Sequence, residues 1–144
     1  MLLYNREGLL FPGIHILSWE DFKLEFGFSD RRKHLLSGLY RAILELKRAG
    51  CLKAYIDGSF VAKKMEPNDY DACWDIVGVD FAILDPVLYK LKGGTHLQKI
   101  KYYGEFYPAH FIEGASGITF LDFFQFDRSG KNKGIVLLEL KGVV

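Results

Sequence analysis

The sequence has few of the features that mark exported, membrane-spanning or metal-scaffolded proteins. Among its 144 residues are only two cysteines, Cys51 and Cys73, too few for a disulfide scaffold and without the paired spacing of a zinc site. No apolar run approaches the ~18–20 residues of a membrane-spanning helix, and no basic N-terminal segment precedes a long apolar one. We therefore expect a protein of the reduced cytoplasm with no membrane partner.

An excess of charge of one sign is also missing, since Lys+Arg 19 against Asp+Glu 18 gives a formal net charge of +1. A general nucleic-acid binder needs a strongly basic field, so any contact with RNA would be local. Apolar residues make up 49% and aromatic residues 15%, enough for a sizeable core. The length fits one domain over residues 1–144, in which we expect residues 1–17 to form an N-terminal arm.

Two helices are predicted before Gly50. The first follows a Ser18 N-cap, and the second follows Ser29 or Asp30 and ends at Gly50. The apolar face of the second helix consists of Leu35, Leu36, Leu39, Ile43 and Leu46. We interpret its basic face as an ordinary solvated surface, with contact to RNA as the alternative; its residues are Arg31, Arg32, Lys33, Arg41, Lys47 and Arg48.

The rest of the chain alternates between strand-like and helix-like segments. The pattern predicts strands over residues 51–56, 69–75 and 135–138, strand-like segments over 98–103 and 106–111, a helix over 85–91, and a last helix capped by Ser116. About one helical turn follows residue 59. The segments indicate an α/β or α+β domain.

The most informative pattern is Gly58-Ser59 followed, after nine residues, by Asp69-Tyr70-Asp71. Strand residues two apart point to the same side, so Asp69 and Asp71 would share a face, and paired carboxylates suit Mg²⁺ with bound phosphate. Glycine allows close backbone approach, and a serine at the start of a helical turn can hold phosphate oxygens. The pattern therefore predicts a site for Mg²⁺ and a phosphorylated ligand.

Residues near this pattern are weaker candidates. Lys63 and Lys64 follow the glycine–serine turn and are candidates for phosphate contact, against the alternative of exposed linker lysines. Cys73 is interpreted as a small apolar filler, because no neighbouring group in the sequence would lower its pKa.

Two segments resemble the signature of the polymerase-beta-type nucleotidyltransferase superfamily: Tyr55-Ile56-Asp57-Gly58-Ser59-Phe60 and Asn68-Asp69-Tyr70-Asp71. Over residues 11–136 the chain is also similar to a small bacterial family of uncharacterised nucleotidyltransferase-like proteins. The superfamily resemblance implies a mixed β-sheet with helices packed mainly on one face. It further implies that Gly58 and Ser59 hold the triphosphate and that Asp69 and Asp71 ligate one or two Mg²⁺ ions.

The same resemblance implies a third acidic residue on a later strand, acting as a base or shared ligand. Glu105 is the first choice, because Lys101, Tyr103 and Glu105 would alternate on one face of a strand. Three further acids compete with it: Asp75, Asp122 and Glu139.

The function implied is an Mg²⁺-dependent transfer of a nucleoside monophosphate, with ATP as the expected nucleotide, to a hydroxyl. The small size favours an acceptor on a partner protein, as in the stand-alone transferases of bacterial toxin–antitoxin pairs. The alternative is a weakly active or inactive nucleotide-binding or antitoxin module that covers a partner protein. Transfer to an RNA end is a third possibility, supported by the basic helix face alone.

Overall fold

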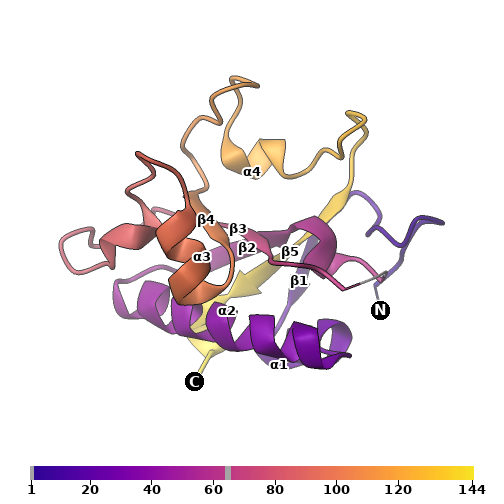
Figure 1. Ribbon diagram of the computed structural model, residues 1–144, viewed down its shortest axis with the longest axis horizontal. Helices are drawn as coiled ribbons and strands as arrows, with labels where there is room; N and C mark the ends of the chain where they lie inside the picture. The colour runs from indigo at the N-terminus through magenta and orange to yellow at the C-terminus, as the bar shows by residue number, and fades with distance from the viewer. Residues whose placement is uncertain (1, 64–65) are drawn as a thin grey trace.

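A five-stranded mixed β-sheet organises the protein (Figure 1), in a computed structural model that describes residues 2–63 and 66–144. Its strands are β1 (Gly13–Leu17), β2 (Lys53–Asp57), β3 (Asp71–Trp74), β4 (Glu105–Pro108) and β5 (Gly134–Glu139), in the order β1-β5-β2-β3-β4. Strand β5 pairs parallel with β1 and antiparallel with β2, whereas β3 pairs antiparallel with β2 and parallel with β4. The predicted mixed sheet is confirmed.

The described residues also form four α-helices: α1 (Trp19–Phe26), α2 (Asp30–Arg48), α3 (His96–Tyr102) and α4 (Phe120–Phe123). Three short 3₁₀ helices are η1 (Gly58–Val61), η2 (Pro86–Leu88) and η3 (Leu140–Gly142). Ser18 and Ser29 accept hydrogen bonds from backbone amides in the first turns of α1 and α2, which confirms both predicted caps. In Figure 1, α1 and α2 lie along one face of the sheet and the short α4 lies over the other.

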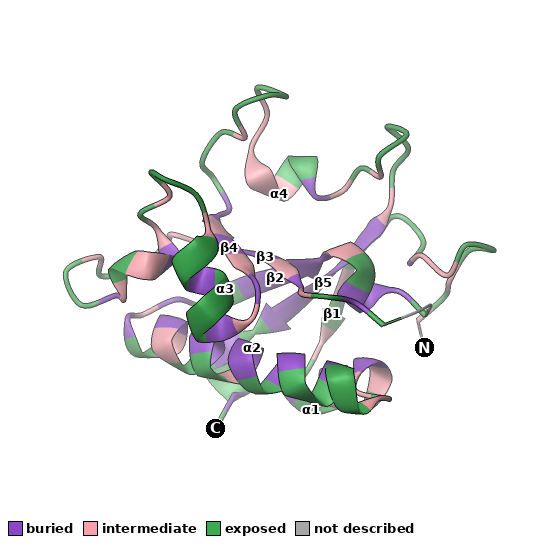
Figure 2. Cartoon of the chain, in the orientation of Figure 1, coloured by how far each residue is buried: buried purple, intermediate pink, exposed green. Residues whose placement is uncertain are grey.

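The core is divided by the sheet into two unequal clusters. The larger one packs the apolar sides of α1 and α2 against alternate strand residues, including Ala54, Ile56, Ala72, Trp74 and Phe106. The smaller one lies on the α4 side and consists of Tyr55, Cys73, Ala109, Phe124, Ile135 and Leu137. Figure 2 shows the buried stripe of α2 turned toward the sheet. The alternation of strand side chains therefore sends successive residues into different environments.

Four local predictions need correction. Residues 13–17 are not part of an arm, because they form β1 and pair with β5. Residues 98–103 are not a strand: most of them belong to α3, whose Leu97 and Ile100 are 64% and 61% exposed. The apolar residues of α3 give this segment the composition of a strand, but its tertiary contacts favour a helix. The helix predicted over 85–91 is reduced to η2, and Thr119, rather than Ser116, caps the last helix.

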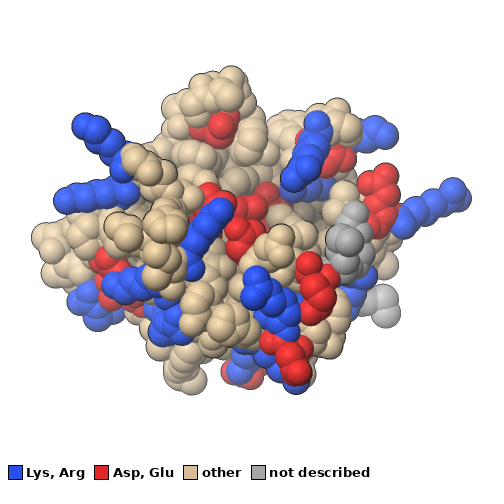
Figure 3. All heavy atoms as spheres, viewed as in Figure 1, with Lys and Arg blue, Asp and Glu red and all other residues tan. Residues whose placement is uncertain are grey.

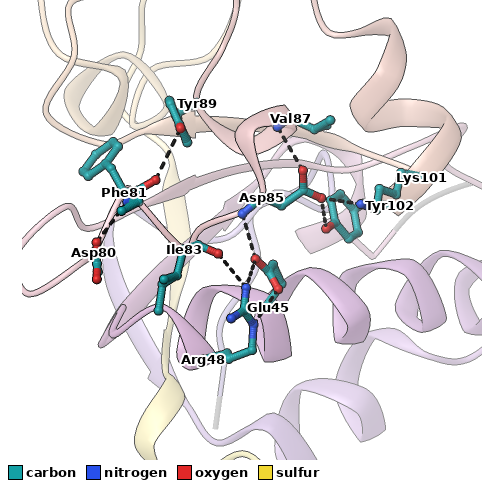
Figure 4. Close-up of polar contacts among 11 residues, drawn as sticks. Glu45, Arg48, Asp80, Phe81, Ile83, Asp85, Val87, Tyr89, Lys101 and Tyr102 are labelled. Carbon is teal, nitrogen blue, oxygen red and sulfur yellow. Dashed lines mark hydrogen bonds and ion pairs between the residues drawn. The ribbon is translucent and has the colours of Figure 1, made fainter.

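A polar network attaches the connection between β3 and α3 to α2 (Figure 4). The Glu45 carboxylate accepts a hydrogen bond from the backbone N–H of Asp85 at 2.7 Å, and Arg48 donates to the carbonyl oxygen of Ile83 at 2.6 Å. Asp85 in turn accepts from the hydroxyl of Tyr102 at 2.6 Å and pairs with Lys101. These bonds fix α3 relative to α2 and therefore beside β4.

No helix in the described part of the chain is long and apolar enough to cross a membrane.

Candidate functional site

Three carboxylates lie in register at one end of strands β2, β3 and β4. Asp57 at the end of β2 pairs with Asp71 at the start of β3, and Asp71 pairs with Glu105 at the start of β4. Residues directly opposite each other on neighbouring strands place their side chains on the same face, about 5 Å apart. We call Asp57, Asp71 and Glu105 the carboxylate row. It lies on the α4 side, the side of Tyr55 and Cys73.

Asp69 joins this row from the loop before β3, since the strand begins only at Asp71. The ammonium of Lys99, on α3, is 3.6 Å from Oδ2 of Asp69 and 3.4 Å from Oε1 of Glu105. Asp69 and Glu105 therefore face the same cation from two sides. In Figure 3 acidic atoms gather near the centre of the face in view, below the projection that carries α4.

The pKa of Asp71 is raised, partly because the neighbouring acids repel one another. Burial, followed by the charges of Glu105, Asp69 and Asp57, raises the pKa of Asp71 to about 7. Burial also raises the pKa of Asp57, although the ammonium of Lys133 lies 2.8 Å from its Oδ1 and acts in the opposite direction. The site thus holds more negative charge than its neighbouring cations neutralise.

Glu105 is the most firmly oriented acid of the row. Its Oε2 accepts hydrogen bonds from the hydroxyls of Thr95 and Tyr107, both at 2.7 Å. Burial alone would raise the pKa of Glu105, but these two bonds together with Lys99 lower it. The ring of Tyr107 stacks on that of Phe120, with centroids 4.2 Å apart, so the first residue of α4 supports the side chain that holds Glu105.

The glycine–serine turn meets the carboxylate row directly. Gly58 begins η1 immediately after β2 with φ +78°, a conformation that favours glycine. A Cβ added to Gly58 would lie 3.0 Å from Oδ2 of Asp71, so the missing side chain keeps space open beside that oxygen. Ser59 follows and is exposed. The turn and Asp71 lie at adjacent strand ends, as the sequence spacing predicts.

A buried arginine of α2 forms hydrogen bonds with the backbone of this turn. The guanidinium of Arg32 donates to the carbonyl oxygens of Ser59, Phe60 and Ala62 at 3.2, 2.6 and 3.0 Å, and to that of Phe26 at 3.2 Å. The assignment of Arg32 to a solvated helix face is therefore wrong: its exposed fraction is 0%. Its donors satisfy carbonyl oxygens that η1 leaves unpaired, which offsets the cost of burying a charge.

The preceding residue, Arg31, holds the second half of the sequence pattern. It donates to the carbonyl oxygens of Pro67 at 3.2 Å and Asn68 at 2.5 Å, directly before Asp69. The start of α2 therefore positions both the glycine–serine turn and the loop that carries Asp69.

Lys63 and the other candidate acids do not join the row. Lys63 pairs with Glu25 of α1 at 3.0 Å, and Lys64 lies outside the described residues. Of the competing acids, Asp75 pairs with His110, whereas Asp122 and Glu139 are exposed. Glu105 is thus the candidate that lies opposite Asp71, whereas phosphate contact by Lys63 stays a prediction without support from this arrangement.

The comparisons with known proteins lead to one match. The model of a family of unknown function, DUF6932, matches residues 2–139. The chain belongs to this family. No curated protein and no solved structure matches it. The DUF6932 match covers every strand of the sheet and all residues of the carboxylate row.

The donor set of this DUF6932 protein suits a hard cation such as Mg²⁺. Asp69, Asp71 and Glu105 offer carboxylate oxygens, and Gly58 leaves the space beside Asp71 free. As the side chains stand, no three His, Cys, Asp or Glu residues within 2–63 and 66–144 are grouped closely enough to hold a metal ion. Asp69 and Asp71 would hold the ion, with Glu105 as the nearest further oxygen donor.

Sequence reasoning missed five polar residues of the site, namely Asp57, Thr95, Lys99, Tyr107 and Lys133. Asp57 carried a usable signal, because it ends a predicted buried strand directly before the glycine–serine turn. The segment that contains Lys99 was predicted to be a strand, so its position over Glu105 had no signal.

Proposed function

We propose that this protein is an Mg²⁺-dependent nucleotidyltransferase, with a nucleotidyltransferase-like fold, that moves a nucleoside monophosphate from ATP to a hydroxyl. The observation that carries the proposal is the meeting of Asp69, Asp71 and Glu105 beside the Gly58–Ser59 turn. The raised pKa of Asp71 supports it, because mutually repelling carboxylates are stabilised by a bound cation. The resemblance to the polymerase-beta-type superfamily concerns the same residues.

The residues divide the reaction between them. The exposed Ser59 and the amides of η1 would bind the triphosphate, while Arg32 keeps the turn in place. A bound Mg²⁺ would supply charge stabilisation for the phosphate oxygens. The acceptor oxygen attacks the α-phosphorus, the bond from that phosphorus to the bridging oxygen breaks, and pyrophosphate leaves. Glu105, ionised at neutral pH and oriented by Thr95 and Tyr107, would accept the hydroxyl proton.

The surface around the site favours a protein as the acceptor. Residues 109–126 carry four large apolar side chains that are at least 40% exposed: Phe111 at 42%, Ile112 at 59%, Phe123 at 40% and Phe126 at 42%. This segment carries α4 and lies over the sheet face that bears the carboxylate row. Exposed aromatic groups of this kind are enriched at protein interfaces, so a partner protein that presents its hydroxyl would contact them.

The test is transfer of label from α-labelled ATP with MgCl₂, first to the protein alone and then to proteins of a cell lysate. Asp69→Asn and Asp71→Asn should lower transfer at least about 10³-fold, since losing a ligand carboxylate removes about 4 kcal/mol of stabilisation. Glu139→Gln, at an exposed acid on the last residue of β5 and outside residues 109–126, is the matched control and should transfer at the wild-type rate.

The opposite result would favour the second candidate function, a nucleotide-binding or antitoxin module that covers a partner protein. Its supporting observation is the same exposed apolar set on residues 109–126. If the wild type transfers no label from any nucleoside triphosphate, or if both Asp→Asn variants transfer as well as the control, the transferase proposal is wrong. Capture of the same partner by wild type and by both variants would then identify the binding module.

A further inference from the structure

The position of Lys99 is not explained by the proposed reaction. Its ammonium is 3.6 Å from Asp69 and 3.4 Å from Glu105, two of the three carboxylates that would surround Mg²⁺. The side chain is 47% exposed, so burial does not force it into this place. An ammonium between two acids of a metal site competes with a metal ion for the same oxygens.

Lys99 is held there by the local backbone. Helix α3 ends at Tyr103, whose φ is +68°, and the chain reaches Glu105 after a single further residue, Gly104. A Cβ on Gly104 would lie 2.5 Å from the ring of Tyr70, so this connection is as tight as a side chain-free residue allows. Residue 99 therefore remains close to residue 105, and α3 is itself anchored to α2 (Figure 4).

In the absence of nucleotide, the charges of the neighbouring side chains favour one divalent ion. Asp57, Asp69, Asp71 and Glu105 carry four negative charges when ionised, and Lys99 and Lys133 supply two positive ones. One divalent ion beside Asp71 completes the balance. A second divalent ion would have to displace Lys99 from Asp69 and Glu105.

We propose that Lys99 is a built-in cation that restricts the carboxylate site to one divalent ion. This inference rests on the proposed function, because it concerns the number of ions in the same metal site. Lys99 sets how many ions bind, whereas Asp69 and Asp71 set whether any ion binds. The ammonium also keeps Asp69 close to Glu105 before an ion arrives.

The experiment is a titration of the full chain with MnCl₂ without nucleotide, in which electron paramagnetic resonance measures free Mn²⁺. The wild type should bind one ion. Lys99→Gln should bind a second ion, because the positive charge that occupies the place beside Asp69 and Glu105 is lost. Lys99→Arg keeps the charge and should bind one ion with at most a twofold change. Lys92→Gln, an exposed lysine before α3, is the neutral-substitution control and should behave as wild type.

Two kinds of failure are distinguishable. If Asp71→Asn abolishes binding but the wild type already binds two ions, or if Lys99→Gln still binds a single ion, the role of Lys99 is wrong and the metal site stands. If Lys99→Gln weakens ATP binding and leaves Mn²⁺ binding unchanged, Lys99 is a nucleotide ligand and the inference is also overturned. If neither wild type nor Lys99→Gln binds Mn²⁺, the metal site of the proposed function fails as well.

Discussion

The two faces of the sheet differ in what covers them. The face toward α1 and α2 carries the large apolar cluster, including fully buried Phe22, Phe26 and Trp74. The opposite face is covered by the four residues of α4 and its flanking loops, and it carries the carboxylate row beside a small apolar cluster. The first face supplies most of the buried apolar area, which leaves the second free to hold groups that oppose folding.

The contrast is visible within single strands. In β3, Ala72 and Trp74 enter the large cluster, whereas Asp71 and Cys73 point to the other side. Burial raises the pKa of Asp71 on that side and also that of Cys73. One strand therefore contributes to stability with alternate residues and to a strained, negatively charged site with the rest.

The largest expected effect breaks the packed face. Phe22→Ala should lower the free energy of unfolding by about 3–5 kcal/mol, because Phe22 contacts Phe26 and Phe60 in a core without exposed surface. Phe124→Ala, on the face covered by α4, should cost less, on the order of 2 kcal/mol, since loops around a small cluster relax more easily. Urea unfolding measures both. Equal losses would contradict the division of stability between the faces.

The next effect is a pH dependence of stability, which arises from Asp71 on the face covered by α4. The pKa of Asp71 is raised to about 7 in the folded protein, against about 3.9 in an unfolded chain. The folded state thus binds the proton more tightly, so this stabilisation is complete below about pH 4 and is lost as the pH rises to about 7.

Asp71→Asn removes this dependence. Relative to wild type, the variant should gain on the order of 4 kcal/mol between pH 4 and pH 8 when divalent ions are chelated. The measurement is the difference in urea-unfolding free energy between variant and wild type at several pH values. A difference independent of pH would show that neither burial nor the neighbouring acids raise the pKa of Asp71.

The smallest effect concerns the divalent ion itself. An ion that binds the folded state at ten times its Kd stabilises by about 1.4 kcal/mol, which corresponds to roughly 4 °C in Tm for a chain of this size. MgCl₂ should therefore raise the Tm of the wild type and leave that of Asp71→Asn unchanged, with NaCl of equal ionic strength as the control. An equal rise in both proteins would mean that the ion acts by general screening.

The sequence allowed the helix caps and the acid pair to be predicted because both depend on short spacings. Ser18 and Ser29 act through amides three residues away, and Asp69 and Asp71 follow a turn that needs glycine at residue 58. Glu105 was chosen on an alternation that does not exist, because Tyr103 ends a helix rather than continuing a strand. Its place opposite Asp71 is a property of strand pairing between residues 34 positions apart, which no local pattern encodes.

The long-range arginine contacts could not be predicted for a similar reason. Arg31 and Arg32 are adjacent in a helix whose basic residues resemble a solvated face. Only the packing of residues 59–62 against the start of α2 distinguishes Arg32 from its exposed neighbours, and residues 67–68 pack against Arg31 in the same way. A buried guanidinium with four carbonyl partners is a tertiary feature.

The sheet order has a consequence for how the chain acquires its structure. β5, the last strand along the chain, is inserted between β1 and β2, two strands made much earlier. Until residues 134–139 leave the ribosome, β1 has no neighbour and one edge of β2 is open. Such distant pairings make assembly slow and expose unpaired edges to aggregation. Completion of the five-stranded sheet therefore waits for residues 134–139, long after β1 and β2 have been made.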